Sequence, residues 1–65
     1  MSTATYTVTG MTCQHCVASV TEEVGELPGV SDVVVELDTG RLTVTGDASA
    51  DAVRDAVHEA GYQLA

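Results

Sequence analysis

The chain is 65 residues long and 45% hydrophobic, with two Tyr and neither Phe nor Trp. This length is enough for one domain over residues 1–65 with a thin core of Val, Leu and Ala, and it leaves no room for a large substrate cleft. Ten acidic residues against Arg41 and Arg54 give a net charge of -8. Such a chain repels phosphates, so nucleic acid is a poor partner.

The first five residues contain no basic residue and no apolar run, so they do not read as a secretory signal. No segment is long and apolar enough to span a bilayer, which argues against membrane insertion and predicts a cytoplasmic location. In a reducing compartment, a lone pair of cysteines is more often catalytic or metal-binding than a structural disulfide. We therefore expect Cys13 and Cys16 to be reduced and available.

The N-terminal half of the chain predicts a strand followed by a helix. From Thr3 to Thr9, Thr alternates with less polar residues, which is typical of a half-buried strand. From about Gln14 to Glu26, apolar residues recur at the helical period, with Cys16 at the edge of their stripe. Pro28 ends this helix, because proline disfavours helical geometry in the residue before it. The apolar stripe consists of Cys16, Val17, Val20, Val24 and Leu27.

The C-terminal half predicts a hairpin, a second helix and a short edge strand. Strands over Val30–Asp38 and Arg41–Thr45 are joined by a turn in which Gly40 can adopt positive φ, so they pair antiparallel. Ser49 caps the next helix, and Gly61 ends it. Tyr62–Ala65 is just long enough for an edge strand. The apolar stripe of the second helix consists of Val53, Ala56, Val57 and Ala60.

The predicted order is therefore βαββαβ, which defines an α+β ferredoxin-like fold. Two amphipathic helices need one common surface against which to bury their apolar stripes. An antiparallel sheet of four strands, covered by helices on one face only, provides that surface. The opposite, Thr-rich face should remain in contact with water.

Both cysteines lie in the stretch Gly10-Met11-Thr12-Cys13-Gln14-His15-Cys16, where the first strand gives way to the first helix. A thiol in the first turn of a helix ionises more readily than a free one, because the amides and the helix dipole favour negative charge. A thiolate is both a nucleophile and a ligand for soft metals. The residues alone thus leave metal capture and thiol–disulfide exchange both open.

The sequence resembles the heavy-metal-associated (HMA) domains, and in particular the small cytoplasmic copper chaperones of bacteria. Four segments carry the resemblance across nearly the whole chain, in the order and spacing of that family. They are Gly10-Met11-Thr12-Cys13-x-x-Cys16, Leu27-Pro28-Gly29-Val30, Asp38-Thr39-Gly40 and Ala60-Gly61-Tyr62.

The resemblance implies a carrier and not an enzyme. Cys13 and Cys16 would bind Cu(I) and pass it to the N-terminal metal-binding domain of a copper-transporting P-type ATPase, or to a copper-responsive repressor. The apo-protein would be a monomer, and the metal could bridge two copies into a dimer. Three further residues are implied as modulators of the site: Met11 beneath the loop, His15 between the cysteines and Tyr62 near the loop.

Two rival functions are weighed against this one. A thiol–disulfide oxidoreductase also places Cys-x-x-Cys at a helix N-terminus, but the chain is short for a thioredoxin-like fold and no aromatic residue precedes Cys13. An HMA domain for Hg, Cd or Zn would use the same two sulfurs. The chain departs from many copper chaperones in having no Lys near the site, so docking of a basic chaperone on an acidic partner does not apply here.

Overall fold

The computed structural model describes residues 2–65, and its helices and strands follow the predicted order. They are β1 (Ser2–Thr9), α1 (Gln14–Gly25), β2 (Val30–Val35), β3 (Arg41–Gly46), α2 (Ala50–Glu59) and β4 (Gln63–Leu64). No helix in this part of the chain is both long and apolar enough to cross a membrane.

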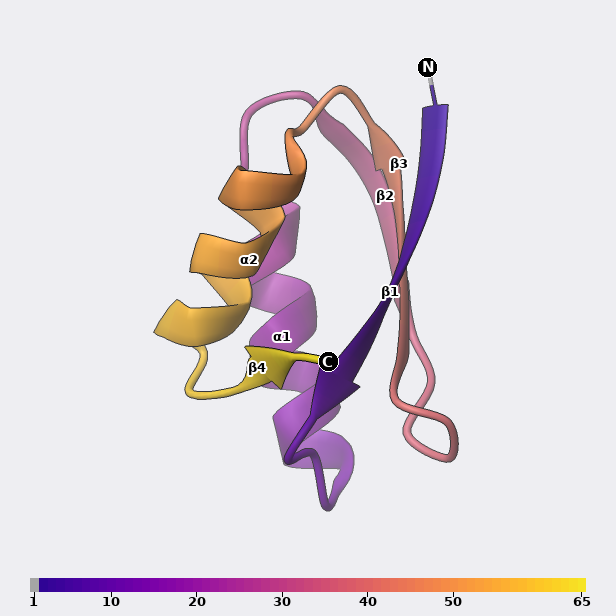
Figure 1. Ribbon diagram of the computed structural model, residues 1–65, viewed down its shortest axis with the longest axis vertical. Coiled ribbons are helices and arrows are strands. Elements are labelled where there is room, and N and C mark those ends of the chain that lie inside the picture. Colours follow the sequence, from indigo (N-terminus) through magenta and orange to yellow (C-terminus); the bar gives the residue numbers. More distant parts are fainter. Residues whose placement is uncertain (1) are drawn as a thin grey trace.

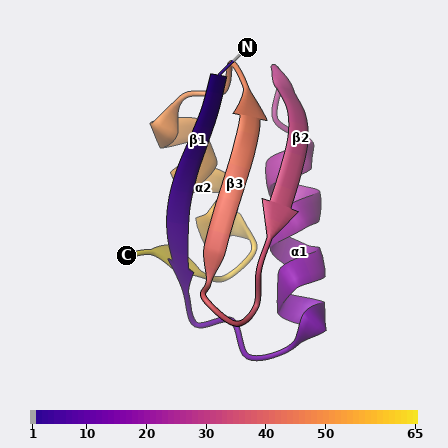
Figure 2. The same cartoon turned by 90° about the vertical axis from the view of Figure 1, so that its right-hand side faces the viewer.

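The four strands form one antiparallel sheet in the order β2-β3-β1-β4. Both helices cover the same face of the sheet, and the loop from β1 to α1 lies at one end of the molecule (Figure 1). The opposite face is open (Figure 2), and the side chains of Thr3, Thr5 and Thr7 are exposed there. The prediction of an α+β ferredoxin-like fold is confirmed.

The core lies between the sheet and the two helices and consists of aliphatic side chains only. Its members come from the predicted apolar faces of β1, α1, β3 and α2, and no polar or charged residue in the described chain is buried. Val17 and Leu27 are half-buried at the margin of this core. The buried residues are Val8, Val20, Val24, Leu42, Val44, Val53, Ala56 and Val57.

β2 ends at Val35 and not at Asp38, so the predicted strand was three residues too long. A longer strand was predicted because Leu37 continues the alternation of apolar residues. The backbone, however, enters the turn directly after Val35. The Glu36 N–H donates to the Arg41 carbonyl at 2.9 Å, and the Gly40 N–H donates to the Glu36 carbonyl at 2.9 Å. These two bonds place Leu37 in the turn.

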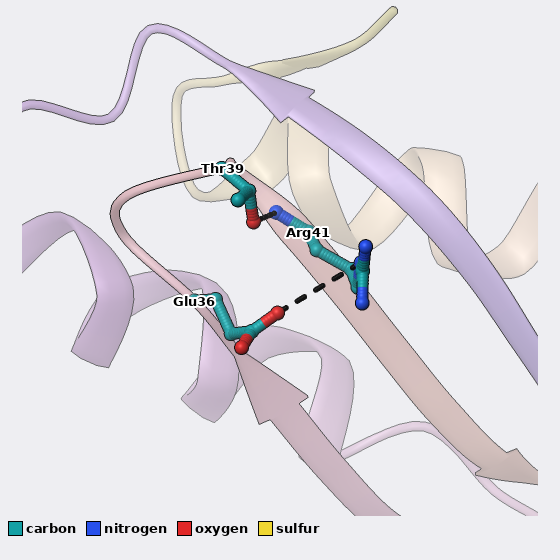
Figure 3. Close-up of polar contacts among 3 residues, drawn as sticks. All are labelled: Glu36, Thr39 and Arg41. Atoms are coloured by element: carbon teal, nitrogen blue, oxygen red, sulfur yellow. Dashed lines mark hydrogen bonds and ion pairs between the residues drawn. The ribbon is translucent and has the colours of Figure 1, made fainter.

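Side chains also tie the two ends of this turn together (Figure 3). The Arg41 N–H donates to Thr39 Oγ1 at 3.2 Å, and Arg41 Nε lies 3.8 Å from Glu36 Oε1. Gly40 has φ of 74°, and a Cβ there would lie 2.6 Å from the Val8 carbonyl oxygen. The turn therefore needs glycine at this position, both for its φ and for its close approach to β1.

Candidate metal centre

The loop from β1 to α1 is shaped by a glycine and supported by an aromatic ring from the other end of the chain. Gly10 has φ of 93°, in the left-handed region that favours glycine. A Cβ at this position would lie 3.5 Å from the Tyr62 ring. Tyr62 lies between α2 and β4, so the packing of the C-terminal segment places its ring against the loop.

Cys13 and Cys16 lie on either side of the start of α1. Cys13 is the N-cap residue, with extended backbone, and its carbonyl accepts the N–H of Cys16 at 3.0 Å and of Val17 at 3.3 Å. No side chain caps this end by a hydrogen bond, and no acidic residue occupies the first turn. The positive end of the helix dipole is therefore available to stabilise negative charge on the two sulfurs.

The two sulfurs are close together but not bonded. Cys13 Sγ lies 3.6 Å from Cys16 Sγ, a distance at which one thiol can donate a hydrogen bond to the other sulfur. Both cysteines are free; Cys13 is exposed and Cys16 is half-buried. A metal ion that binds here can reach both sulfurs, and an incoming molecule meets Cys13 first.

The surroundings of Cys16 favour its thiolate. The backbone amide of Thr12 is the largest cause, and the Tyr62 hydroxyl is the second; together they lower the pKa of Cys16 from 9.0 to about 6. The same contact raises the pKa of Tyr62, chiefly because its neutral hydroxyl donates a hydrogen bond to the Cys16 sulfur, and further because of desolvation and of the negative charge on that sulfur. Cys16 is therefore largely ionised at neutral pH, as a metal ligand must be.

The structure assigns different positions to the three predicted modulators. Tyr62 lies at the site. Met11 is half-buried and packs against the core. His15 is exposed, although it lies between the two cysteines in sequence. Of the three, Tyr62 is the residue whose side chain lowers the pKa of Cys16.

Thr12 is a residue of the site for which no role was predicted. Its Oγ1 lies 3.9 Å from Cys16 Sγ, so a weak hydrogen bond can form between them. The only hint of this contact in the sequence is the position of Thr12 inside the cysteine motif, directly before the N-cap residue. That position does not predict the contact, because the contact depends on how the loop turns back over the first turn of the helix.

The donor set is small and soft. Across residues 2–65 no cluster of three or more His, Cys, Asp or Glu side chains could hold a metal ion. A structural zinc site takes four such ligands, and these two sulfurs do not form one by themselves. Two thiolates suit a soft metal of low coordination number.

Comparison with known proteins gives consistent matches in sequence and structure. The heavy-metal-associated domain matches residues 5–63. Copper chaperone CopZ of Bacillus subtilis is 46% identical over 68 residues, covering 100% of this chain and 99% of the relative. Copper-transporting ATPase 2 of Rhizobium meliloti is 42% identical over 60 residues, which is 88% of this chain and 7% of the ATPase. A solved CopZ metallochaperone has a TM-score of 0.94 at 28% identity, covering 98% of this chain and 100% of the other.

The chain belongs to the heavy-metal-associated domain family. The matched region contains both cysteines, both helices, β2 and β3 in full, and parts of β1 and β4. HMA chaperones are metal-binding carriers without enzymatic activity, which confirms the prediction that the chain is not an enzyme. The ferredoxin-like fold of the family also argues against the thiol–disulfide oxidoreductase considered above.

Proposed function

We propose that the chain is a cytoplasmic copper chaperone that captures Cu(I) between Cys13 and Cys16 and passes it to a copper-transporting P-type ATPase. Residues 1–65 act as one metal-binding domain. The observation that carries the proposal is the pair of free sulfurs, 3.6 Å apart at the start of α1, with one of them exposed. Soft thiolates favour Cu(I).

The geometry supports capture followed by a small opening of the site. Two sulfurs on opposite sides of one metal would be about 4.6 Å apart if each bond were about 2.3 Å, the usual length for zinc and sulfur. The sulfurs must therefore separate by about 1 Å when they bind Cu(I) in a linear arrangement. Cys13 can move, because it is exposed and precedes the helix.

Low coordination also explains transfer. A thiolate of the partner forms a new bond to Cu(I), and the bond to one of the two chaperone sulfurs then breaks. A second partner thiolate displaces the remaining sulfur, and the released thiolates take up protons lost by the partner's thiols. Copper stays Cu(I) throughout and never becomes free. The exposure of Cys13 lets the partner's sulfur approach.

The comparisons support the choice of partner. The relative that is 46% identical is named a copper chaperone, and the ATPase match covers a segment about as long as this chain. The chaperone and the ATPase domain would then have the same fold, and each would carry its own pair of cysteines. A copper-responsive repressor is a second recipient, because it needs the same ligand exchange. The apo-protein is a monomer, and excess Cu(I) bridges two copies through exposed Cys13.

The negative charge on the helices constrains the partner's surface. Carboxylates from both helices line a groove of about 270 Å³ on the outer side of the helical layer. The two arginines pair with carboxylates elsewhere, Arg41 with Glu36 and Arg54 with Asp51. The partner domain therefore carries basic residues around its own cysteines. The carboxylates that line the groove are Glu22, Glu23, Glu26 and Glu59.

The test is metal stoichiometry together with X-ray absorption. We expect one Cu(I) per monomer and a first shell of sulfur only, at low coordination number. Cys13→Ser and Cys16→Ser should each lose most of the affinity, while His15→Ala should keep the stoichiometry. Nitrogen or oxygen ligands that dominate the first shell of the monomer would contradict the proposal.

The rival metals and the rival chemistry are tested separately. Competition between Cu(I) and Zn(II), Cd(II) or Hg(II) establishes which metal the two sulfurs prefer, and a clear preference for Zn(II) would overturn the assignment of Cu(I). Reduction of insulin disulfides tests for an oxidoreductase. We expect no turnover, because a chaperone exchanges ligands and transfers no electrons.

A further inference from the structure

β1 is longer than the strand beside it. β4 pairs with β1 at Val8 and Thr9 only, and the Ala65 N–H then donates to the Thr7 carbonyl at 2.8 Å. From residue 2 to residue 6, β1 has β3 on one side and no strand of the described chain on the other. Figure 2 shows this free edge on the side of β1 away from β3, above the chain end marked C.

The pairing pattern identifies which backbone groups the edge exposes. The Thr7 carbonyl points toward β4, whereas the Val8 N–H points the other way, to the Gly40 carbonyl at 2.7 Å. The register of β1 on β3 is regular over these positions, so Thr3 and Thr5 have the same orientation as Thr7. Their N–H and carbonyl groups therefore point outward, where an incoming strand can pair with them.

The other edge of the sheet is protected and this one is not. Along β2, the register shifts between Val30 and Asp32, which places a bulge at Ser31. Asp32 also adds a charge to that edge. Bulges and charges are devices that keep sheet edges from pairing with other chains. The free edge of β1 has neither a charged residue, nor a proline, nor a bulge.

A groove of about 380 Å³ lies beside this edge, between β1, α2 and the C-terminal segment. Tyr6 and Leu64, both half-buried, form its apolar part. Arg54 is its only charged residue; its nearest carboxylate, Asp51, is 3.7 Å away and 90% exposed, so it holds Arg54 weakly. The lining residues are Thr5, Tyr6, Thr7, Ala50, Arg54, Leu64 and Ala65.

We propose that the free edge of β1 binds an extended segment of a partner protein by strand addition. The segment places an apolar side chain over Tyr6 and Leu64, and a carboxylate at Arg54. Main-chain hydrogen bonds to Thr3 and Thr5 fix the register of the bound segment relative to β1. Contacts in the groove determine which side chains the segment must carry. The carboxylate complements Arg54, which among residues 2–65 carries the one cationic side chain that lines the groove.

A second copy of this chain fits the edge poorly. In an antiparallel pair of β1 strands, the side chains that enter the groove would be Ser2 and Ala4, which are too small to fill it. Residues 2–9 also contain no carboxylate for Arg54. Two copies with a net charge of -8 each repel one another. The occupant is therefore a strand of different sequence.

The edge and the metal loop lie at opposite ends of β1 (Figure 1). A segment bound at residues 2–6 leaves Cys13 and Cys16 accessible, so this contact and metal exchange do not compete. The inference therefore stands apart from the proposed function, and it can be tested in the metal-free protein. A failure of one leaves the other intact.

The experiment titrates apo-protein with a peptide and follows backbone amides by NMR. The probe is an N-acetylated, C-amidated hexapeptide in which Thr alternates with Leu, Glu and Leu. We expect shifts at β1 residues 3–7 and around Arg54, slower hydrogen exchange of the Thr5 amide, and no shift at Cys13 or Cys16. The same peptide with N-methyl groups on its pairing amides should not bind.

Two variants test the two parts of the contact. Thr5→Pro removes an outward N–H without breaking the ladder to β3, and it should abolish binding. Arg54→Gln should weaken binding of this peptide by about two- to fivefold, and it should not change the binding of a matched peptide that carries Gln in place of Glu. Arg41→Gln is the matched control and should have no effect, because Arg41 pairs with Glu36 away from the groove.

Three results would overturn the proposal. They are the absence of shifts at residues 3–7 at the highest soluble peptide concentration, equal binding of the N-methylated peptide, and shifts confined to the metal loop. Formation of a dimer through β1, seen by sedimentation and lost in Thr5→Pro, would replace the partner segment with a second copy and so contradict it as well.

Discussion

At the scale of single residues, the two cysteines differ in what surrounds them. Cys13 is exposed at the N-cap, whereas Cys16 is half-buried in the first turn and contacts Thr12. The surroundings of Cys16 thus favour its thiolate, and Cys13 is the more exposed of the two residues. In the proposed function, this difference would let one pair of residues both hold a metal and release it.

Tyr62→Phe should raise the pKa of Cys16 from about 6, because the hydroxyl that favours the thiolate is lost. The shift should be partial, since the larger cause, the backbone amide of Thr12, remains. Thiolate absorbance in the ultraviolet, measured against pH, reports the value. Tyr6→Phe removes a hydroxyl elsewhere and serves as the control. An unchanged titration in Tyr62→Phe would show that the contact has no effect on Cys16.

The lowered pKa of Cys16 also predicts how the stability of the reduced apo-protein depends on pH. Folding lowers this pKa from 9.0 to about 6, so the folded state favours the thiolate. The resulting stabilisation is complete above pH 9 and is lost as the pH falls through about 6. Urea denaturation across this window should show stability that rises with pH, more steeply than in Cys16→Ser. Parallel curves for the two proteins would refute the linkage.

At the scale of elements, the two helices begin in different ways. α2 has a conventional cap, in which Ser49 Oγ accepts the Ala52 N–H at 3.1 Å, and Asp51 lies in its first turn. α1 begins at Cys13 with neither feature. α1 thus leaves its first amides available to the sulfurs, while α2 has a side chain that caps its N-terminus.

Ser49→Ala should destabilise the protein by about 1 kcal/mol, the usual cost of losing an N-cap side chain. Urea denaturation measures the change. Ser19→Ala is the matched control, because Ser19 Oγ donates to the His15 carbonyl within α1, a bond that contributes little to helix stability. Equal losses in the two variants would mean that the cap itself is not the cause.

At the scale of the whole molecule, the core does not involve the metal site. None of the eight buried hydrophobic residues is a cysteine or lies in the loop. The fold should therefore form without metal, unlike that of a zinc finger, whose folding depends on its ion. Charge is distributed unevenly around this core, with carboxylates of both helices facing one groove.

The reduced apo-protein should show the circular dichroism of a folded α+β domain and a cooperative thermal transition. Replacing both cysteines with Ser should leave the thermal midpoint nearly unchanged near pH 6, where the thiolate of Cys16 adds little. A largely unfolded apo-protein would mean that the metal organises the chain, and the core would then be insufficient.

Transfer of Cu(I) to the partner domain should slow as ionic strength rises, because salt screens the attraction between the acidic groove and a basic partner. Glu22→Lys should slow transfer at low salt, whereas Asp32→Lys, on the far edge of the sheet, should not. A rate that is flat or faster with salt would instead indicate an encounter held by the shared metal and apolar contacts. No change after replacing Met11, Tyr62 and Glu22 together would exclude this docking face.

Much of the fold follows from local patterns. Alternation over residues 3–9 and the two apolar stripes predicted β1, α1 and α2, because burial of one face imposes a period on the chain. The end of β2 was missed because Leu37 keeps the alternation while Glu36 and Arg41 close the turn. Such backbone pairing depends on the partner strand, so it cannot be predicted from the alternation of apolar residues along β2.

The presence of two sulfurs at a helix N-terminus, in an acidic and aliphatic domain, could be predicted from the sequence, since these properties depend on neighbouring residues and on composition. Three other features could not be predicted: the effect of the Tyr62 hydroxyl on Cys16, the groove that carboxylates of α1 and α2 share, and the lack of a neighbouring strand on the outer side of β1 at residues 2–6. Each of these features joins segments far apart in the chain. Their meeting depends on how the helices pack on the sheet, which no local pattern encodes.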